Sequence, residues 1–86
     1  LHNINVQSKT NRPFNMAMPE PTSRKRRFRE AESPIRVKCD AHPWMEAWLH
    51  VVAHPFFAVT DATGAFALPP LPDGTYTLRA WHERMG

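Results

Sequence analysis

The stretch that decides the fold runs from residue 35 to residue 53 and reads IRVKCDAHPWMEAWLHVVA. Its first five residues alternate apolar and charged side chains, which is typical of a β-strand with one buried face. This alternation directs Ile35, Val37 and Cys39 toward the core. The run at 46–53 predicts a second strand, and Pro43 indicates a tight loop because proline cannot donate to a ladder. We therefore predict a strand–loop–strand hairpin with Cys39 at the end of its first strand.

The rest of the chain has a composition that favours short strands. Nine prolines divide it into segments too short for long helices, and the runs between them are rich in Val, Phe, Thr, Trp and Tyr. We predict an all-β chain with further strands at 1–8, 56–60, 65–68 and 75–81. Residues 9–34 are predicted to form a long irregular connection, with short helical character over 23–32. No stretch has the roughly 18 apolar residues that a membrane span needs.

Cys39 is the only cysteine, so it cannot form an internal disulfide. It is a buried thiol, a nucleophile or a metal ligand. The string Cys39-Asp40-Ala41-His42-Pro43-Trp44-Met45 places a thiolate, an imidazole and a thioether on one short loop. Soft donors of this kind select copper, or soft metals generally, and a Cys/His/His set with a weak axial Met is the blue-copper arrangement. His2, which precedes Asn3 and an alternating strand, is the best candidate for the second histidine.

The loop resembles that of the amicyanin-type cupredoxins, which carry a Cys-x-x-His-Pro-aromatic-Met string and an upstream His followed by Asn. The resemblance covers residues 1–53, which correspond to the C-terminal part of a cupredoxin-like β-sandwich. It implies that His2, Cys39 and His42 are equatorial copper ligands and that Met45 is the axial one. It also implies that Asn3 hydrogen-bonds across to the cysteine loop and holds the two parts of the site in register.

Two departures from the cupredoxin pattern bear on metal affinity. The opening strands of such a domain are missing, and the basic loop at 19–34 has no counterpart in a minimal cupredoxin. Both ends of the chain look cut, so we expect a piece of a longer protein. The alternative to ligation is that Cys39 is a small buried hydrophobe, with His42, Trp44 and Met45 packing the hairpin.

The downstream stretch VTDATGAFALPPLPDGTYTLRAWHE, residues 59–83, resembles the carboxypeptidase regulatory-like domain. The resemblance rests on the D-x-x-G turn, the Phe-x-Leu strand and the Leu-Pro-x-Gly-Thr-Tyr turn. It implies that residues 54–86 form the first strands of a small transthyretin-like sandwich, truncated before its closing strands. Such domains are usually accessory modules without catalytic activity.

Basic side chains are concentrated in one segment, and one tryptophan lies in the cysteine loop. Five of the eleven lysines and arginines lie within six residues, at Arg24, Lys25, Arg26, Arg27 and Arg29. This segment is either a solvated loop or a docking site for an acidic protein or a membrane surface. We do not expect nucleic-acid binding, because Phe28 is the lone aromatic there and has no stacking platform around it. Trp44 can shield the metal or form a hydrophobic docking face.

The remaining residues only weakly indicate zinc binding or enzymatic catalysis. His50, His54 and His82 are scattered over different segments and do not predict a zinc site. No catalytic triad, phosphate loop or carboxylate pair is apparent, so we do not expect an enzyme. The sequence thus predicts a periplasmic or otherwise extracytoplasmic blue-copper protein that transfers single electrons to or from a redox partner protein. The alternative is a metal-free structural subunit of a larger membrane-associated complex, such as a redox or photosynthetic one.

Overall fold

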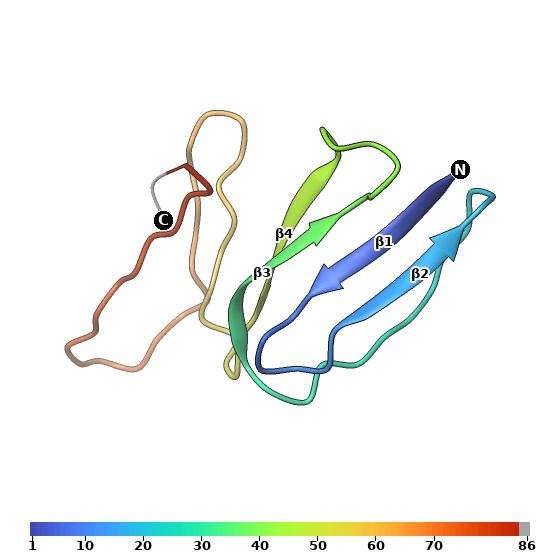
Figure 1. Cartoon of the computed structure of the whole chain (residues 1–86). Helices are drawn as coiled ribbons and strands as arrows, with labels where there is room; N and C mark the ends of the chain where they lie inside the picture. Colours follow the sequence, from blue (N-terminus) through green and yellow to red (C-terminus); the bar gives the residue numbers. More distant parts are fainter. Residues whose placement is uncertain (85–86) are drawn as a thin grey trace. The chain divides into compact units, whose positions relative to one another are not determined.

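The computed structural model describes residues 1–84, which contain four β-strands and no helix. The strands form one antiparallel sheet in the order β2-β1-β3-β4 (Figure 1). The all-β prediction is confirmed, although the described residues contain one sheet rather than the two of a sandwich. None of them forms a helix able to cross a membrane. The chain divides into two compact units, Leu1–Ala53 and His54–Gly86.

Strand β1 (His2–Gln7) lies inside the sheet and pairs with β2 on one side and β3 on the other. Its side chains alternate, so Ile4 and Val6 share one face while Asn3 and Asn5 share the opposite face. Val6 is only 2% exposed and belongs to the core. The two faces of β1 therefore separate an apolar layer from a row of amides.

Strand β2 (Phe14–Met18) corrects the prediction that residues 9–34 are irregular throughout. It pairs antiparallel with β1, with Met16 opposite Ile4 and Phe14 opposite Val6. Opposite residues in an antiparallel pair point to the same face. The Phe and Met side chains of β2 therefore extend the apolar face of β1, which explains why this Pro-flanked segment forms a strand.

Strands β3 (Glu32–Lys38) and β4 (Glu46–Val51) form the predicted hairpin. Their register places Ile35 opposite Leu49 and Val37 opposite Ala47, so both strands add to the same apolar face. Ile35 is fully buried, whereas Leu49 is 39% exposed. The face is thus well covered at its centre and open toward β4.

A polar cluster around the half-buried Glu32, here called the Glu32 clamp, is formed by Glu32, Lys9, Asn11 and Glu30 at the start of β3. The Glu32 carboxylate accepts hydrogen bonds from the main-chain N–H groups of Lys9 (2.6 Å) and Asn11 (2.9 Å) and from Asn11 Nδ2 (3.0 Å). Asn11 also exchanges two 2.9 Å hydrogen bonds with the main chain of Glu30. These contacts lower the pKa of Glu32 to about 2, with the Asn11 main chain as the largest cause. The clamp ties the β1–β2 loop to the start of β3.

The predicted helical character at 23–32 is wrong, because this segment has no helix and its last residue begins β3. The segment instead contacts the sheet through Phe14. The rings of Phe14 and Phe28 lie 6.0 Å apart between centroids, and the Arg26 guanidinium lies 4.4 Å from the Phe14 centroid. Aromatic and cation–π contacts to one strand replace the broad apolar face that a helix would need.

The predicted strands at 56–60, 65–68 and 75–81 do not form among the described residues, because the four strands of the structure all lie between His2 and Val51. The predicted turn at 61–64 is present. Asp61 Oδ1 accepts hydrogen bonds from Thr63 N (2.8 Å) and Ala65 N (3.1 Å), and Gly64 adopts a φ of 83°. Local side-chain chemistry is therefore enough to build the turn but not the strands beside it.

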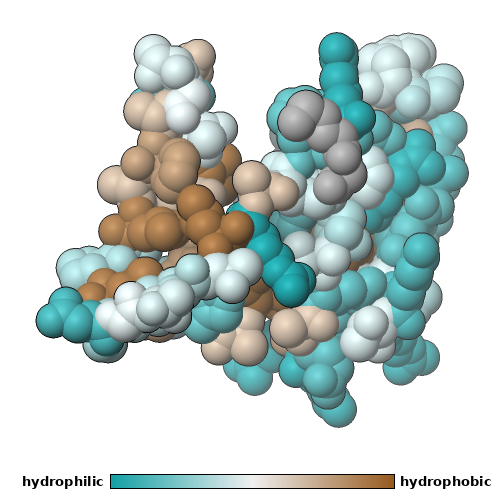
Figure 2. Space-filling model, turned by 90° about the vertical axis from the view of Figure 1, so that its left-hand side faces the viewer, coloured by the Kyte–Doolittle hydropathy of each residue, from teal (hydrophilic) through white to brown (hydrophobic). Residues whose placement is uncertain are grey.

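Large apolar side chains remain exposed in this second unit. Their exposed fractions are 85% for Val59, 66% for Leu78, 57% for Phe57 and 53% each for Phe66 and Tyr76. Figure 2 shows hydrophobic side chains gathered at the surface. In a second turn, the Tyr76 hydroxyl donates to Pro72 O at 2.6 Å. The unit holds its turns but leaves its apolar side chains uncovered.

Candidate metal centre

Cys39 follows the last residue of β3 and is 5% exposed. Its N–H donates to Met45 O at 3.1 Å, and Met45 N–H donates to His42 O at 2.9 Å. The second bond closes a four-residue turn with Pro43 in its second position, where the fixed φ of proline is favoured. The hairpin and this turn together hold Cys39, His42 and Met45 on one rigid loop.

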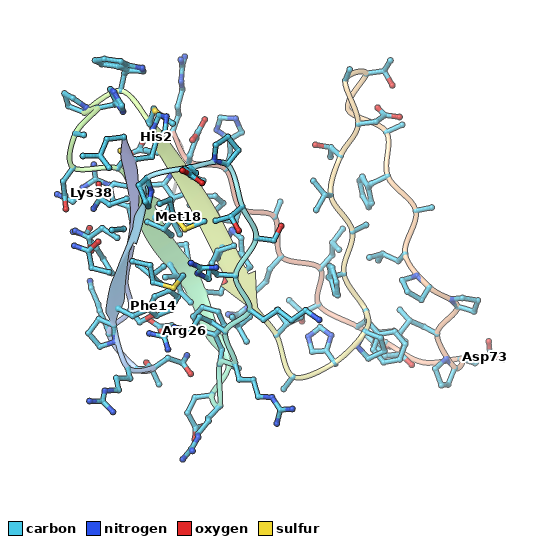
Figure 3. All side chains as sticks on the ribbon, turned by 90° about the vertical axis from the view of Figure 1, so that its right-hand side faces the viewer. His2, Phe14, Met18, Arg26, Lys38 and Asp73 are labelled. Atoms are coloured by element: carbon cyan, nitrogen blue, oxygen red, sulfur yellow. The ribbon has the colours of Figure 1, made fainter. Side chains whose placement is uncertain are left out.

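The pairing of β1 with β3 brings His2 to this loop. Val6 lies opposite Val37 and Asn5 opposite Lys38, so the continued register places Ile4 opposite Cys39. His2 shares the face of Ile4 because the two residues are two positions apart in a strand. Figure 3 shows His2 at the end of the sheet where this loop lies.

The three donor atoms of His2, Cys39 and His42 lie within 4.8 Å of one another. Cys39 Sγ lies 4.0 Å from His2 Nδ1 and 3.5 Å from His42 Nδ1. An ion bonded to sulfur at about 2.3 Å and to nitrogen at about 2.0 Å would set these atoms about 3.5–3.7 Å apart in tetrahedral or trigonal geometry. The Cys39–His42 separation matches this range and the Cys39–His2 separation is slightly longer, so this cluster can hold a metal ion.

Met45 lies on the same side of the sheet as Cys39, since the two residues are paired directly beyond the β3–β4 ladder. Both line an open hollow of about 360 Å³ that also includes Ile4 and Val37. Met45 is 39% exposed. The Met45 thioether therefore borders the same hollow as the Cys39 thiol, and the structure gives no bond between the two sulfur atoms.

Asn3 links β1 to the cysteine loop. Its Oδ1 accepts the N–H of Asp40 at 2.8 Å and lies 3.5 Å from Cys39 Sγ. Its Nδ2 donates to Asp40 Oδ2 at 2.8 Å and to Asn15 Oδ1 at 2.9 Å. The amide thus fixes the main chain on the C-terminal side of Cys39.

Sequence reasoning missed the polar cluster around Asp40. The Asp40 carboxylate also accepts from Asn5 Nδ2 (3.2 Å to each oxygen) and from Asn15 Nδ2 (3.4 Å), and Lys38 Nζ lies 3.3 Å from it. Hydrogen bonds from Asn3 and Asn5 are the largest causes of the lowered pKa of Asp40. The alternation of Asn3 and Asn5 with Ile4 and Val6 was the available signal, but Asn15 required the position of β2.

The surroundings of Cys39 favour its thiolate form. Hydrogen bonding with the Asn3 main chain is the largest cause that lowers the pKa of Cys39 to about 7, and burial opposes it. His2 and the main chain of His42 and Ala41 lower it further. The thiolate is the form that binds a metal.

Trp44 is 78% exposed and lies beside a ligand candidate. Its ring centroid is 5.2 Å from that of His42, whose ring lies 4.7 Å from that of His2. The His42 ring therefore contacts both the His2 ring and the exposed Trp44 ring. Trp44 covers His42 and presents an apolar face outward.

None of His50, His54 and His82 belongs to the cluster of His2, Cys39 and His42 in the part of the chain that the structure describes. His50 Nδ1 contacts Ser33 Oγ, His54 Nδ1 accepts from Phe56 N, and His82 Nδ1 accepts from Arg84 N. Within residues 1–84, His2, Cys39 and His42 form the one group of His, Cys or acidic side chains arranged to share an ion. Comparisons with protein-family models, with curated proteins and with solved structures gave no match for this chain.

Proposed function

We propose that this chain forms the copper site of an extracytoplasmic type 1 (blue) copper protein that transfers one electron at a time. The observation that carries the proposal is the convergence of Cys39 Sγ with His2 Nδ1 at 4.0 Å and His42 Nδ1 at 3.5 Å. The two histidines come from different strands and loops, so chance clustering on one loop does not account for the set.

The donor types favour copper over zinc. A thiolate and two imidazoles suit both ions, but the neighbouring Met45 thioether is a soft donor that zinc rarely uses. In this proposal His2, Cys39 and His42 are the equatorial ligands and Met45 is the axial one. Bound copper would supply a one-electron couple.

The chain contributes rigidity to that process. The main-chain bonds between Cys39 and Met45 and between Met45 and His42 fix the loop at both ends. The Asn3 side chain fixes it from β1. Ligands held in this way move little when the charge of an ion changes, which lowers the reorganisation that electron transfer requires. Trp44 limits the access of water to His42.

We propose further that residues 1–53 represent a cupredoxin-like part and residues 54–86 a carboxypeptidase regulatory-like part of a larger protein. A periplasmic or other extracytoplasmic location fits this combination. We propose no catalytic turnover for the chain, whose ligand set would serve electron transfer with a redox partner protein.

A second candidate function is a structural subunit of a larger membrane-associated complex. The exposed apolar side chains of the second unit, such as Val59 at 85% and Leu78 at 66%, favour it. Exposed side chains of this size mark surfaces that partners cover. In this case the cupredoxin-like fold would be free of metal.

The test is a visible absorption titration of the full chain with Cu(II). We expect an intense thiolate-to-copper band in the wild-type protein, reversibly removed by a one-electron reductant. Cys39→Ala should abolish the band, and His42→Ala should weaken or shift it. His82→Gln is the matched control, because it removes a histidine that lies outside the cluster.

Three outcomes separate the candidates. A band that depends on Cys39 and survives His82→Gln supports a copper site. A folded wild-type protein without a band contradicts the proposal and leaves the structural subunit. Tight Zn(II) binding in place of Cu(II), measured by competition, would assign the cluster to zinc.

A further inference from the structure

Four consecutive basic side chains surround one open hollow on the first unit. The hollow measures about 620 Å³ and is lined by Arg24, Lys25, Arg26 and Arg27. All four residues are exposed. Arg29 belongs to the same basic segment but does not line the hollow. Four of the five basic side chains of the segment therefore line one concave surface.

These charges are not neutralised within the described residues. The ion pairs formed there join Arg36 to Glu46 and Lys38 to Asp40, and neither involves the basic segment. Like charges placed side by side repel one another, and an external anion relieves that repulsion. The hollow thus has the electrostatics of a binding site for a negatively charged group.

The segment is attached to the sheet at defined points. Arg26 lies over the Phe14 ring at 4.4 Å, and Phe28 packs on the same ring. Just beyond, Glu30 is held by two hydrogen bonds to the buried Asn11. Figure 3 shows Arg26 beside Phe14. Attachment at these points reduces the ordering cost that a free basic tail would have on binding.

We propose that this hollow docks a protruding acidic segment of a partner protein. A concave set of four cations matches a convex loop that carries several carboxylates. A bilayer would meet the cations along a plane and would not fill a hollow. A single-stranded nucleic acid would need exposed aromatic rings for its bases, and the nearby Phe28 is packed against Phe14.

The docking site lies away from the candidate metal centre. Phe14 is opposite Val6, and His2 is opposite Met18, at the other end of the β1–β2 pair. Val6 lies four residue steps along the strand from His2, which corresponds to about 14 Å. A partner can therefore bind the hollow without covering His42 or Trp44. The proposal does not depend on copper.

The experiment uses the full chain without metal and a fluorescent Glu-rich peptide, with a Gln-rich peptide of equal length as the neutral probe. The variant combines Arg24→Gln, Lys25→Gln and Arg27→Gln, and leaves Arg26 on Phe14. The matched control combines Arg12→Gln, Arg79→Gln and Arg84→Gln. Both triple variants lose three positive charges. Affinity is measured by fluorescence anisotropy at several salt concentrations.

We expect the Glu-rich peptide to bind and the Gln-rich peptide not to bind. The hollow variant should weaken binding by at least about tenfold, and the control by about twofold or less, because close charge pairs contribute more than distant ones. Equal weakening by both variants would overturn the proposal in favour of net charge alone. So would stronger binding to phosphatidylserine vesicles or to a single-stranded oligonucleotide than to the peptide.

Discussion

Similar sequence patterns form strands in the first unit of the chain and not in the second. In Leu1–Ala53, short apolar–polar runs pair into four strands that share one apolar face. In the described part of His54–Gly86, comparable runs form no strand beside two well-formed turns. An alternating pattern therefore makes a segment compatible with a strand. The strand forms only when a partner strand and a shared apolar layer are present.

Polar contacts show the same contrast. In the first unit, Glu32 and Asp40 each join segments far apart in sequence, through Asn11 in one case and Asn3 in the other. In the second unit, Asp61 bonds only within its own turn, to Thr63 and Ala65. Long-range polar contacts accompany the paired sheet, and local ones accompany the unpaired segment.

The largest effect should come from the core of the first unit. Ile35→Ala removes most of a fully buried side chain, and such a change in a core costs about 2–5 kcal/mol. Leu78→Ala in the second unit, where Leu78 is 66% exposed, should change the free energy of unfolding by about 0.5 kcal/mol or less. Urea denaturation followed by circular dichroism measures both. Equal effects would show that the second unit has its own packed core.

The Glu32 clamp should make the first unit sensitive to acid. The pKa of Glu32 is lowered from 4.5 to about 2 in the folded protein. Its stabilisation is therefore complete above the unfolded value and is lost as the pH falls through about 2. We expect the difference in stability between wild type and Glu32→Gln to shrink over this range.

Asp40 also has a lowered pKa, as does Asp61 in the second unit. For that reason the relevant measurement is the difference in stability between wild type and Glu32→Gln. Asp61→Asn is the matched control from the second unit. A constant difference between wild type and Glu32→Gln from pH 5 to 2 would contradict the prediction.

A smaller effect is expected at the cysteine loop. Asp40→Ala removes the acceptor for Asn3, Asn5 and Asn15, so the loop should open more often. We expect Cys39 to be alkylated several-fold faster in the metal-free protein, with rates compared at the alkaline plateau where the thiol is fully ionised. Asp40→Asn, which retains a carbonyl acceptor, should lie between. Unchanged alkylation in Asp40→Ala would mean that the β3–β4 hairpin alone holds the loop.

A local effect is expected at the turn in the second unit. Gly64 has a φ of 83°, and an added Cβ would meet nothing within 4 Å. The cost of Gly64→Ala is therefore limited to the left-handed backbone, about 1 kcal/mol. Limited proteolysis at the turn should become about fivefold faster, with Gly64→Asn nearer to wild type because Asn tolerates this conformation. No change would indicate that the turn already opens freely.

Sequence alone predicted much of the site and less of the sheet. The alternation of Ile35, Val37 and Cys39 predicted a buried thiol at a strand end, and Cys39 is buried. The spacing to His42 and Met45 predicted a shared loop. The strand at 14–18 was not predicted, because FNMAM has little β-branched content and lies between prolines. The strands of the second unit were predicted from alternation and did not form.

What the sequence by itself determined is local: an all-β chain, the hairpin around Cys39 and the turn at Asp61, all of which follow from period-two alternation, proline and short-range hydrogen bonds. What the tertiary structure decided is the pairing. The antiparallel register of β1 with β3 brings His2 to Cys39 across 37 residues, and β2 supplies Asn15 to the Asp40 cluster. Pairing depends on contacts between distant segments, and no local pattern encodes which partner a strand will find.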